Sequence, residues 1–152
     1  MANNVQVVKT IPEHGSCFVC GSQNPGNLGV RLQLLDDRTI TTQTTFSLAQ
    51  QGPPGFAHGG ASAALLDEVM GCGVWVAGFQ AAAVELNIYY HKPVPLNRCV
   101  TVNGRVKEKE GRAIHTQGEI RLPDGTIAVT AKGVYVKAPQ LFKAMFDDIL
   151  PS

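Results

Sequence analysis

Residues 55–85 read GFAHGGASAALLDEVMGCGVWVAGFQAAAVE, an apolar segment that opens on the string GFAHGG. From Gly59 to Val84, Asp67 and Glu68 are the only formally charged residues, and they lie side by side. A carboxylate in apolar surroundings costs free energy unless it has a charged or hydrogen-bonding partner, or faces a solvent-filled cleft or a substrate. These two acids are therefore the first candidates for catalytic or substrate-binding residues.

The apolar segment is expected to form one long helix. Residues 50–55 contain two glycines and two prolines, which predicts a loop followed by a helix that starts near Gly59. The helix should run to about Ala77, because Gly78 can stop it there.

Strands are predicted before and after this helix in the sequence. Runs of β-branched and aromatic residues alternate there with turn signals such as Asp36-Asp37-Arg38 and Pro123-Asp124-Gly125. The predicted strands are Val30–Leu35, Thr39–Leu48, Ala82–His91, Cys99–Glu108, Arg112–Leu122 and Thr126–Lys137. Hairpin connections favour a mostly antiparallel sheet, and a helix apolar almost all round must be wrapped by it. An α+β fold is expected over residues 1–152 as one domain, with a short terminal helix at Pro139–Ile149.

Composition excludes several function classes. The chain has 152 residues, 44% hydrophobic and 16% charged, with a net charge of +1, so no global field favours nucleic acid or an anionic membrane. Residues 1–11 lack the apolar core of a secretory signal, and the apolar run Val69–Val84 is shorter than the roughly 20 residues of a membrane-spanning helix. A cytoplasmic protein is expected, in which the four cysteines stay reduced.

Two strings of the sequence resemble a known family. They are GPPGFAHGGA at 52–61, followed by LDE at 66–68, and LNIYYHKPVP at 86–95. In this order and spacing they resemble the hotdog-fold acyl-CoA thioesterases of the phenylacetyl-CoA (PaaI-like) and 4-hydroxybenzoyl-CoA type. The resemblance implies a curved sheet around one helix, pairing into a homodimer that can assemble further to a homotetramer, and thioester hydrolysis at the subunit interface. Coenzyme A would enter as part of the substrate, with no separate cofactor.

The start of the helix offers a physical reason for that chemistry. Its first backbone N–H groups lack helical partners and carry a partial positive charge, so they can stabilise the oxyanion of an attacked thioester. The resemblance places the polarising N–H at Gly59, next to His58. Gly59 and Gly60 have no side chain that would block the approach of substrate. His58 is expected either to orient the loop or the carbonyl, or to be a structural cap.

Asp67 is the expected general base or nucleophile. It follows Gly59 by 67 − 59 = 8 positions, or about 12 Å at about 1.5 Å per residue, too far for both to touch one carbonyl. The site should therefore combine Gly59 of one protomer with Asp67 of another. Glu68 lies about 100° further round the helix and is expected to meet a polar residue at the interface or the sheet rim.

Position 83 departs from the family. Relatives often have a hydroxyl residue at the position of Ala83, where it helps to place the attacking water or the carboxylate. Strand alternation predicts that Ala83 shares a face with Glu85, Asn87, Tyr89 and His91. The departure keeps open an alternative, a non-hydrolytic acyl-CoA binding or sensing module with the same pocket.

The substrate-binding residues expected from these strings are Gly60, Phe56, Ala83, His91 and Lys92. His91 and Lys92 are candidates for the phosphates of coenzyme A, because phosphates need cations or backbone N–H groups. The acyl group itself cannot be named from the sequence.

A separate feature is the spacing His14-x2-Cys17-x2-Cys20. It offers three zinc ligands, whereas structural zinc normally takes four, and no second pair follows in the sequence. The expectation from sequence is a packed loop that covers the helix mouth and binds no metal.

Overall fold

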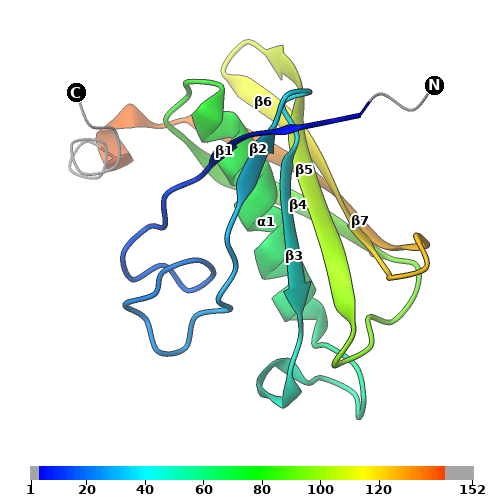
Figure 1. Ribbon diagram of the computed structural model, residues 1–152. Coiled ribbons are helices and arrows are strands. Elements are labelled where there is room, and N and C mark those ends of the chain that lie inside the picture. The colour runs from blue at the N-terminus through cyan, green and yellow to red at the C-terminus, as the bar shows by residue number, and fades with distance from the viewer. Residues whose placement is uncertain (1–3, 143–152) are drawn as a thin grey trace.

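The computed structural model describes residues 4–142, which form one antiparallel sheet and one long helix (Figure 1). The sheet order is β1-β2-β3-β5-β6-β7-β4, so that β1 and β4 are its edges. The strands are β1 (Val7–Thr10), β2 (Gln33–Leu35), β3 (Ile40–Thr45), β4 (Ala81–Tyr90), β5 (Cys99–Glu110), β6 (Ala113–Arg121) and β7 (Ile127–Lys137).

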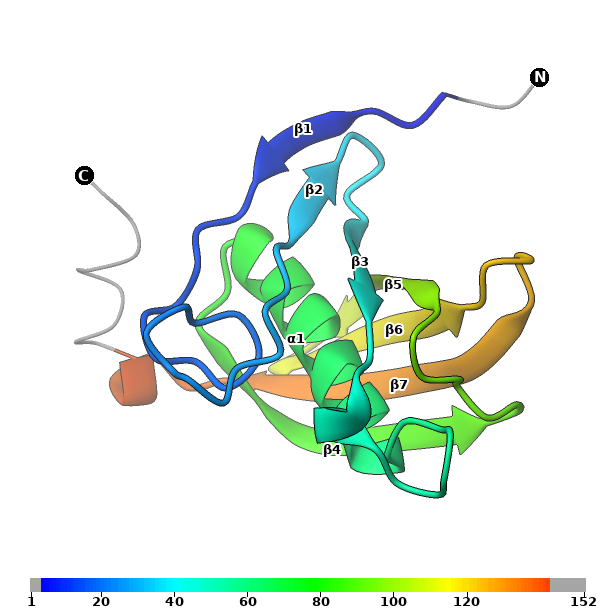
Figure 2. The ribbon, with the colours of Figure 1, turned by 60° about the horizontal axis from the view of Figure 1, so that its bottom comes forward.

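The helix α1 (Gly59–Val76) lies in the concave side of this sheet, and Figure 2 shows the strands curving round it. It begins after His58, the N-cap, and ends at Ala77, where Gly78 takes a φ of +94° that favours glycine. Five of its side chains have no exposed surface, each contributing about 1.5–3 kcal/mol of hydrophobic free energy: Leu65, Leu66, Val69, Met70 and Val74. The expected hotdog arrangement is confirmed.

The sequence did not predict β1. All four of its residues are exposed, and it adds to the sheet edge by pairing with β2, so no apolar alternation marks it. The predicted strands Val30–Leu35 and Thr39–Leu48 are shorter in the structure. The second ends at Thr45 because Ser47 caps a 3₁₀ turn, η1 (Leu48–Gln50).

A β-bulge corrects the predicted faces of β4. Ala83 pairs with Tyr135 but Glu85 pairs with Val134, so Val84 is an extra residue without a partner in the register. Paired residues share a face, and Tyr135 points at α1. Ala83 therefore faces the helix, as Leu86 does, and not the outer surface with Glu85 as alternation had predicted.

The loop between β1 and β2 lies against the side of α1 that the sheet leaves open (Figures 1 and 2). At the other end of the chain, residues 139–142 are helical, and the rest of the predicted helix up to Ile149 lies outside the described residues. No helix among residues 4–142 has the length and apolarity needed to cross a bilayer.

Candidate functional site

The first residues of α1 form a turn with one unused donor. The Nδ1 atom of His58 accepts a hydrogen bond from the Gly60 N–H at 2.8 Å, which makes His58 the helix cap. The Gly59 N–H, in contrast, donates no hydrogen bond within residues 4–142. Capping was one of the two roles expected for His58, and its contact with Gly60 is the contact of a cap. The N–H of Gly59 is then the one that a ligand can reach.

Tyr90 occupies the space beside Gly59. Its hydroxyl donates to the Gly59 carbonyl at 2.7 Å, and a Cβ added at Gly59 would lie 3.1 Å from that oxygen. Burial raises the pKa of Tyr90, so the phenol remains a donor at neutral pH. Glycine at position 59 therefore makes room for Tyr90, in addition to the approach of substrate that the sequence suggested.

A cavity of about 320 Å³ opens at this turn. It brings together four residues of the predicted site from two segments that are distant in the sequence: Phe56 and Gly59 from one, His91 and Lys92 from the other. His91 is also held by a hydrogen bond of 2.8 Å between its Nε2 and the Thr130 hydroxyl. Asp67 and Ala83 do not line this cavity within one chain.

Asp67 lies two turns further along α1 and is held by Tyr135 of β7. The Tyr135 hydroxyl donates to Oδ1 of Asp67 at 2.7 Å and also lies 3.0 Å from the Asp67 carbonyl oxygen. Burial raises the pKa of Tyr135 far above its usual value, and the negative charge of Asp67 adds to this. Tyr135 is therefore a fixed donor toward the carboxylate.

Two glycines make the space for the Tyr135 ring. A Cβ at Gly71 would lie 3.3 Å from this ring, and one at Gly133 only 2.9 Å from it. Sequence reasoning missed Tyr135, although a signal was present. Alternation places it on the buried face of a predicted strand, and a buried tyrosine hydroxyl normally has a hydrogen-bond partner.

Ala83 pairs with Tyr135 on the same face of the sheet. The position at which the family resemblance led us to expect a hydroxyl is thus next to Tyr135, the residue that binds Asp67. Ala83 is exposed because β4 is an edge strand.

Within one chain, Glu68 meets the N-terminal loop and not the sheet rim, which was one of its two expected places. Its Oε1 lies 3.6 Å from Nδ1 of His14 and 3.7 Å from Sγ of Cys17. Burial acts to raise the pKa of Glu68, but hydrogen bonds from His14 and Cys20 outweigh it, so the pKa is lowered. Asp67 and Glu68, adjacent in sequence, therefore have separate surroundings.

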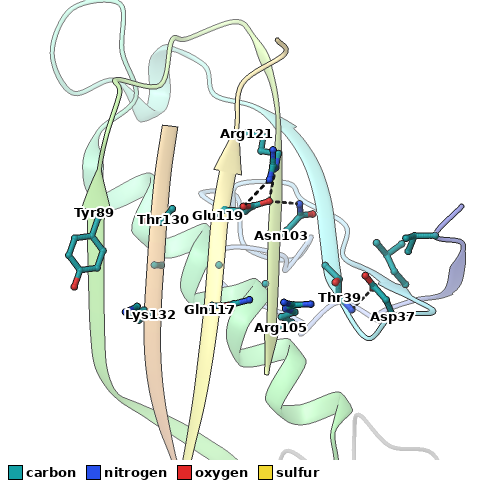
Figure 3. Close-up of a pocket in the computed structure, with 15 residues that line it drawn as sticks. Asp37, Thr39, Tyr89, Asn103, Arg105, Gln117, Glu119, Arg121, Thr130 and Lys132 are labelled. Carbon is teal, nitrogen blue, oxygen red and sulfur yellow. Dashed lines mark hydrogen bonds and ion pairs between the residues drawn. The ribbon is translucent and has the colours of Figure 1, made fainter. Parts of the chain in front are cut away.

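A larger hollow of about 540 Å³ lies on the outer face of the sheet, as Figure 3 shows with α1 behind the strands. Its polar lining includes Asn103, Arg105, Glu119, Arg121 and Lys132. Neither Asp67 nor Gly59 reaches it, so this hollow is not the candidate catalytic site.

The sequence model of a protein family, the Thioesterase superfamily, matches residues 54–129, which is 76 of 152 residues, or half of the chain. The chain belongs to the thioesterase superfamily. The matched residues include the turn at Gly59, Asp67 and strand β4, so the expected family is confirmed.

Individual members of this superfamily are similar over different lengths. The acyl-coenzyme A thioesterase THEM4 of Xenopus laevis is 36% identical over 89 residues, 57% of this chain and 40% of THEM4. The chain thus spans about two fifths of that relative. The crystal structure of a thioesterase superfamily protein is 36% identical over 80% of this chain and 60% of that one, with a TM-score of 0.77. The PaaI protein of E. coli shares the fold at 18% identity, with a TM-score of 0.65, over 73% of this chain and 80% of PaaI.

Proposed function

We propose that this superfamily member hydrolyses an acyl-CoA thioester to a free acid and coenzyme A, at an interface between two copies of the chain. Asp67 acts as general base toward water or as nucleophile toward the acyl carbon, and the Gly59 N–H stabilises the oxyanion. The observation that carries the proposal is the Gly59 N–H, which donates to no acceptor in residues 4–142 and opens onto a cavity.

Two copies are required because of the distance along α1. Eight positions separate Gly59 from Asp67, or about 12 Å, which exceeds the reach of one carbonyl group. A second chain could contribute the missing group along β4, an edge strand with exposed apolar side chains. Those side chains are Val84, Leu86, Tyr89 and Tyr90, exposed by 64%, 37%, 48% and 55%.

The coenzyme A moiety is proposed because Lys92 and His91 line the same cavity as Gly59. Phosphates need donors of this kind, so these two residues are the candidates for the phosphates at the far end of the pantetheine arm. Phe56 adds an apolar wall. The name of the Xenopus relative, an acyl-coenzyme A thioesterase, supports this substrate class.

Mixed dimers test the proposal. One parent carries Asp67→Asn; the other carries Gly59→Pro, because proline is accepted at the first helical residue but has no N–H. Each parent should release almost no thiol from acyl-CoA substrates. After unfolding and refolding as a 1:1 mixture, about half of the dimers are mixed, each with one intact site, so about a quarter of the wild-type rate should return. A mixture as inactive as its parents would contradict the shared site.

A second candidate function rests on Ala83. Because this position has no hydroxyl beside Tyr135, the chain could bind acyl-CoA without turnover and act as a sensing module. Calorimetric binding of aryl, short-chain and long-chain acyl-CoAs, measured alongside thiol release, separates the two functions. Binding without cleavage by the wild type, with cleavage gained by an Ala83→Ser variant, would favour the module, whereas thiol release by the wild type would exclude it.

A further inference from the structure

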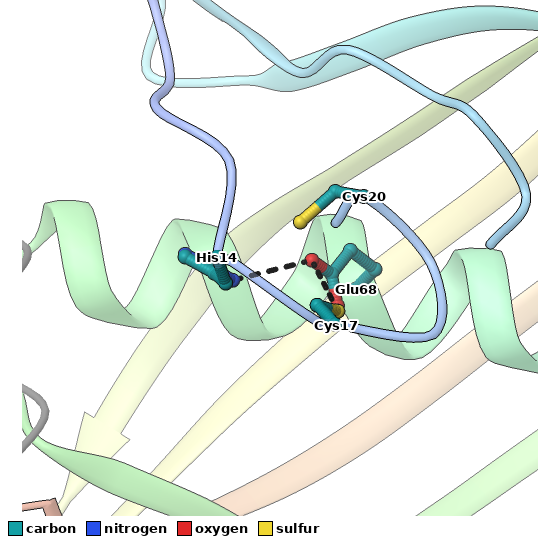
Figure 4. A group of neighbouring side chains, drawn as sticks. All are labelled: His14, Cys17, Cys20 and Glu68. Atoms are coloured by element: carbon teal, nitrogen blue, oxygen red, sulfur yellow. Dashed lines mark hydrogen bonds and ion pairs between the residues drawn. The ribbon is translucent and has the colours of Figure 1, made fainter. Parts of the chain in front are cut away.

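Four potential metal ligands converge where the N-terminal loop crosses α1 (Figure 4). They are a ring nitrogen of His14, the sulfurs of Cys17 and Cys20, and a carboxylate oxygen of Glu68, and all lie within 4.8 Å of one another. The loop supplies three of them and the helix the fourth. The sequence showed only the three on the loop, because 48 positions separate Cys20 from Glu68 (68 − 20).

These separations are close to those of a tetrahedral zinc site. With ordinary zinc–ligand bonds of about 2.0–2.3 Å, tetrahedral geometry puts nitrogen and oxygen ligands about 3.4 Å apart, and sulfur and oxygen about 3.6 Å apart. The measured distances are 3.6 Å between His14 Nδ1 and Glu68 Oε1, and 3.7 Å between Cys17 Sγ and the same oxygen. Every pair of ligand atoms lies within 4.8 Å, so no pair exceeds the tetrahedral sulfur–sulfur value of about 3.8 Å by more than about 1 Å.

The loop is also shaped to hold its sulfurs. The Cys17 N–H donates to the His14 carbonyl at 2.8 Å, and the Val19 N–H points at the Cys17 sulfur at 3.4 Å. Arg31 donates to the Cys20 carbonyl at 3.1 Å. Gly21 closes the turn so tightly that a Cβ there would lie 2.3 Å from the Cys17 nitrogen. Hydrogen bonds of this kind, around the ligands rather than from them, orient the ligands of metal sites.

Burial distinguishes this cluster from scattered surface groups. Cys20 is only 3% exposed, and the side chains of His14 and Glu68 are 24% and 16% exposed. Two thiolates, an imidazole and a carboxylate form a donor set that suits Zn²⁺ among the common divalent ions, and two thiolates disfavour Mg²⁺ and Ca²⁺.

We propose that His14, Cys17, Cys20 and Glu68 bind one zinc ion, which fastens the N-terminal loop to α1. All four positions of the ion are then filled by the protein, so the site is structural and has no open position for substrate. It is independent of the proposed hydrolysis, because Glu68 and not Asp67 is the ligand. Glu68 is the fourth ligand that the spacing on the loop lacked, and the proposal departs here from the metal-free loop expected from the sequence.

Metal content is the first test. Protein made without an affinity tag, kept under a phosphine reductant and dialysed without chelator, should contain about one zinc per chain by mass spectrometry. Replacement of zinc by Co²⁺ should give a thiolate-to-cobalt charge-transfer band and the intense visible bands of tetrahedral cobalt. Metal-poor protein whose reduced thiols give no such band on cobalt titration would overturn the proposal.

Variants assign the ligands. Glu68→Gln keeps the size of the side chain but loses the charge, and it should weaken zinc binding by about 100-fold or more, as should Cys17→Ser. Cys99→Ser is the matched control, because Cys99 is an exposed free thiol on β5 outside the cluster. Zinc should raise the melting temperature of wild type and Cys99→Ser but not of Glu68→Gln. If Glu68→Gln, folded by circular dichroism, binds zinc as tightly as the control, Glu68 is not a ligand and the proposal fails.

Discussion

The hydroxyl of Tyr135 lies 2.7 Å from Oδ1 of Asp67, and 68 positions of sequence separate the two residues. The contact joins β7 to the middle of α1 and fixes the carboxylate at one end. A carboxylate that must act on a thioester carbonyl needs such an anchor, because a misplacement of about 1 Å can cost about 100-fold in rate. Tyr135 is therefore a positioning residue for Asp67 in the proposed reaction.

Tyr135→Phe should lower kcat/KM by about 10–100-fold, since it frees the carboxylate without removing it. The free energy of unfolding should fall by only about 1.5–3 kcal/mol, as for one lost hydrogen bond to a charged group. Thiol-release kinetics and urea unfolding measure the two effects. Thr41→Val is the control, because it removes another side-chain hydroxyl that donates a hydrogen bond, to Asn103 at 2.6 Å between β3 and β5, and it should leave kcat/KM unchanged. Equal activity of Tyr135→Phe and wild type would remove Tyr135 from the mechanism.

Gly59→Pro and Gly59→Ala isolate the contribution of one backbone donor. Both variants add a Cβ that meets Tyr90 at about 3.1 Å, but only proline lacks the N–H. His58 already has a ψ of 136°, the extended conformation that a residue before proline prefers, so the helix start should be retained. The proline variant should be about 100–1,000-fold slower than the alanine variant in kcat, the usual effect of one oxyanion donor. Similar rates for the two would assign the oxyanion to another group.

Val84→Lys tests the use of the β4 edge. Val84 is 64% exposed at the bulge, so a lysine there should leave the chain folded while placing charge on an apolar edge. Sedimentation velocity should show a dimer that dissociates at concentrations at least about tenfold higher than for wild type. The matched control is Val8→Lys, because Val8 is 62% exposed on β1 at the opposite edge. A larger effect from Val8→Lys would place the interface at β1.

The thiols should differ in reactivity. Burial raises the pKa of Cys72 to about 12, and the negative charge of Glu68 adds to this, so the group stays a protonated thiol at pH 8. Cys99 is exposed. Iodoacetamide should therefore alkylate Cys99 in the native protein and leave Cys72 unmodified, as read by peptide mass spectrometry. Both should react in urea, and rapid native labelling of Cys72 would show that α1 opens readily.

Much of the fold was predictable from local patterns. The helix was expected from about Gly59 to Ala77 and is found at Gly59–Val76, because a proline- and glycine-rich loop and Gly78 mark its ends. The later strands agree within about two residues at each end. The strand β1 was missed because all four of its residues are exposed. The faces of β4 were misassigned at Ala83 because the alternation of residues along the sequence does not reveal a bulge. Homodimer, homotetramer and cytoplasmic location stay predictions.

The candidate site likewise contains some residues that local sequence patterns predict and others that only the folded structure brings together. Gly59, His58 and Asp67 could be named from one continuous segment, because a helix start and a pair of adjacent acids on an apolar helix are local features of the chain. The partners of those residues could not be named. Tyr135 meets Asp67, and the His14–Cys20 loop meets Glu68, only after the sheet has curled round α1. Contacts between such distant segments depend on how the whole chain packs, and neighbouring residues in the sequence carry little information about them.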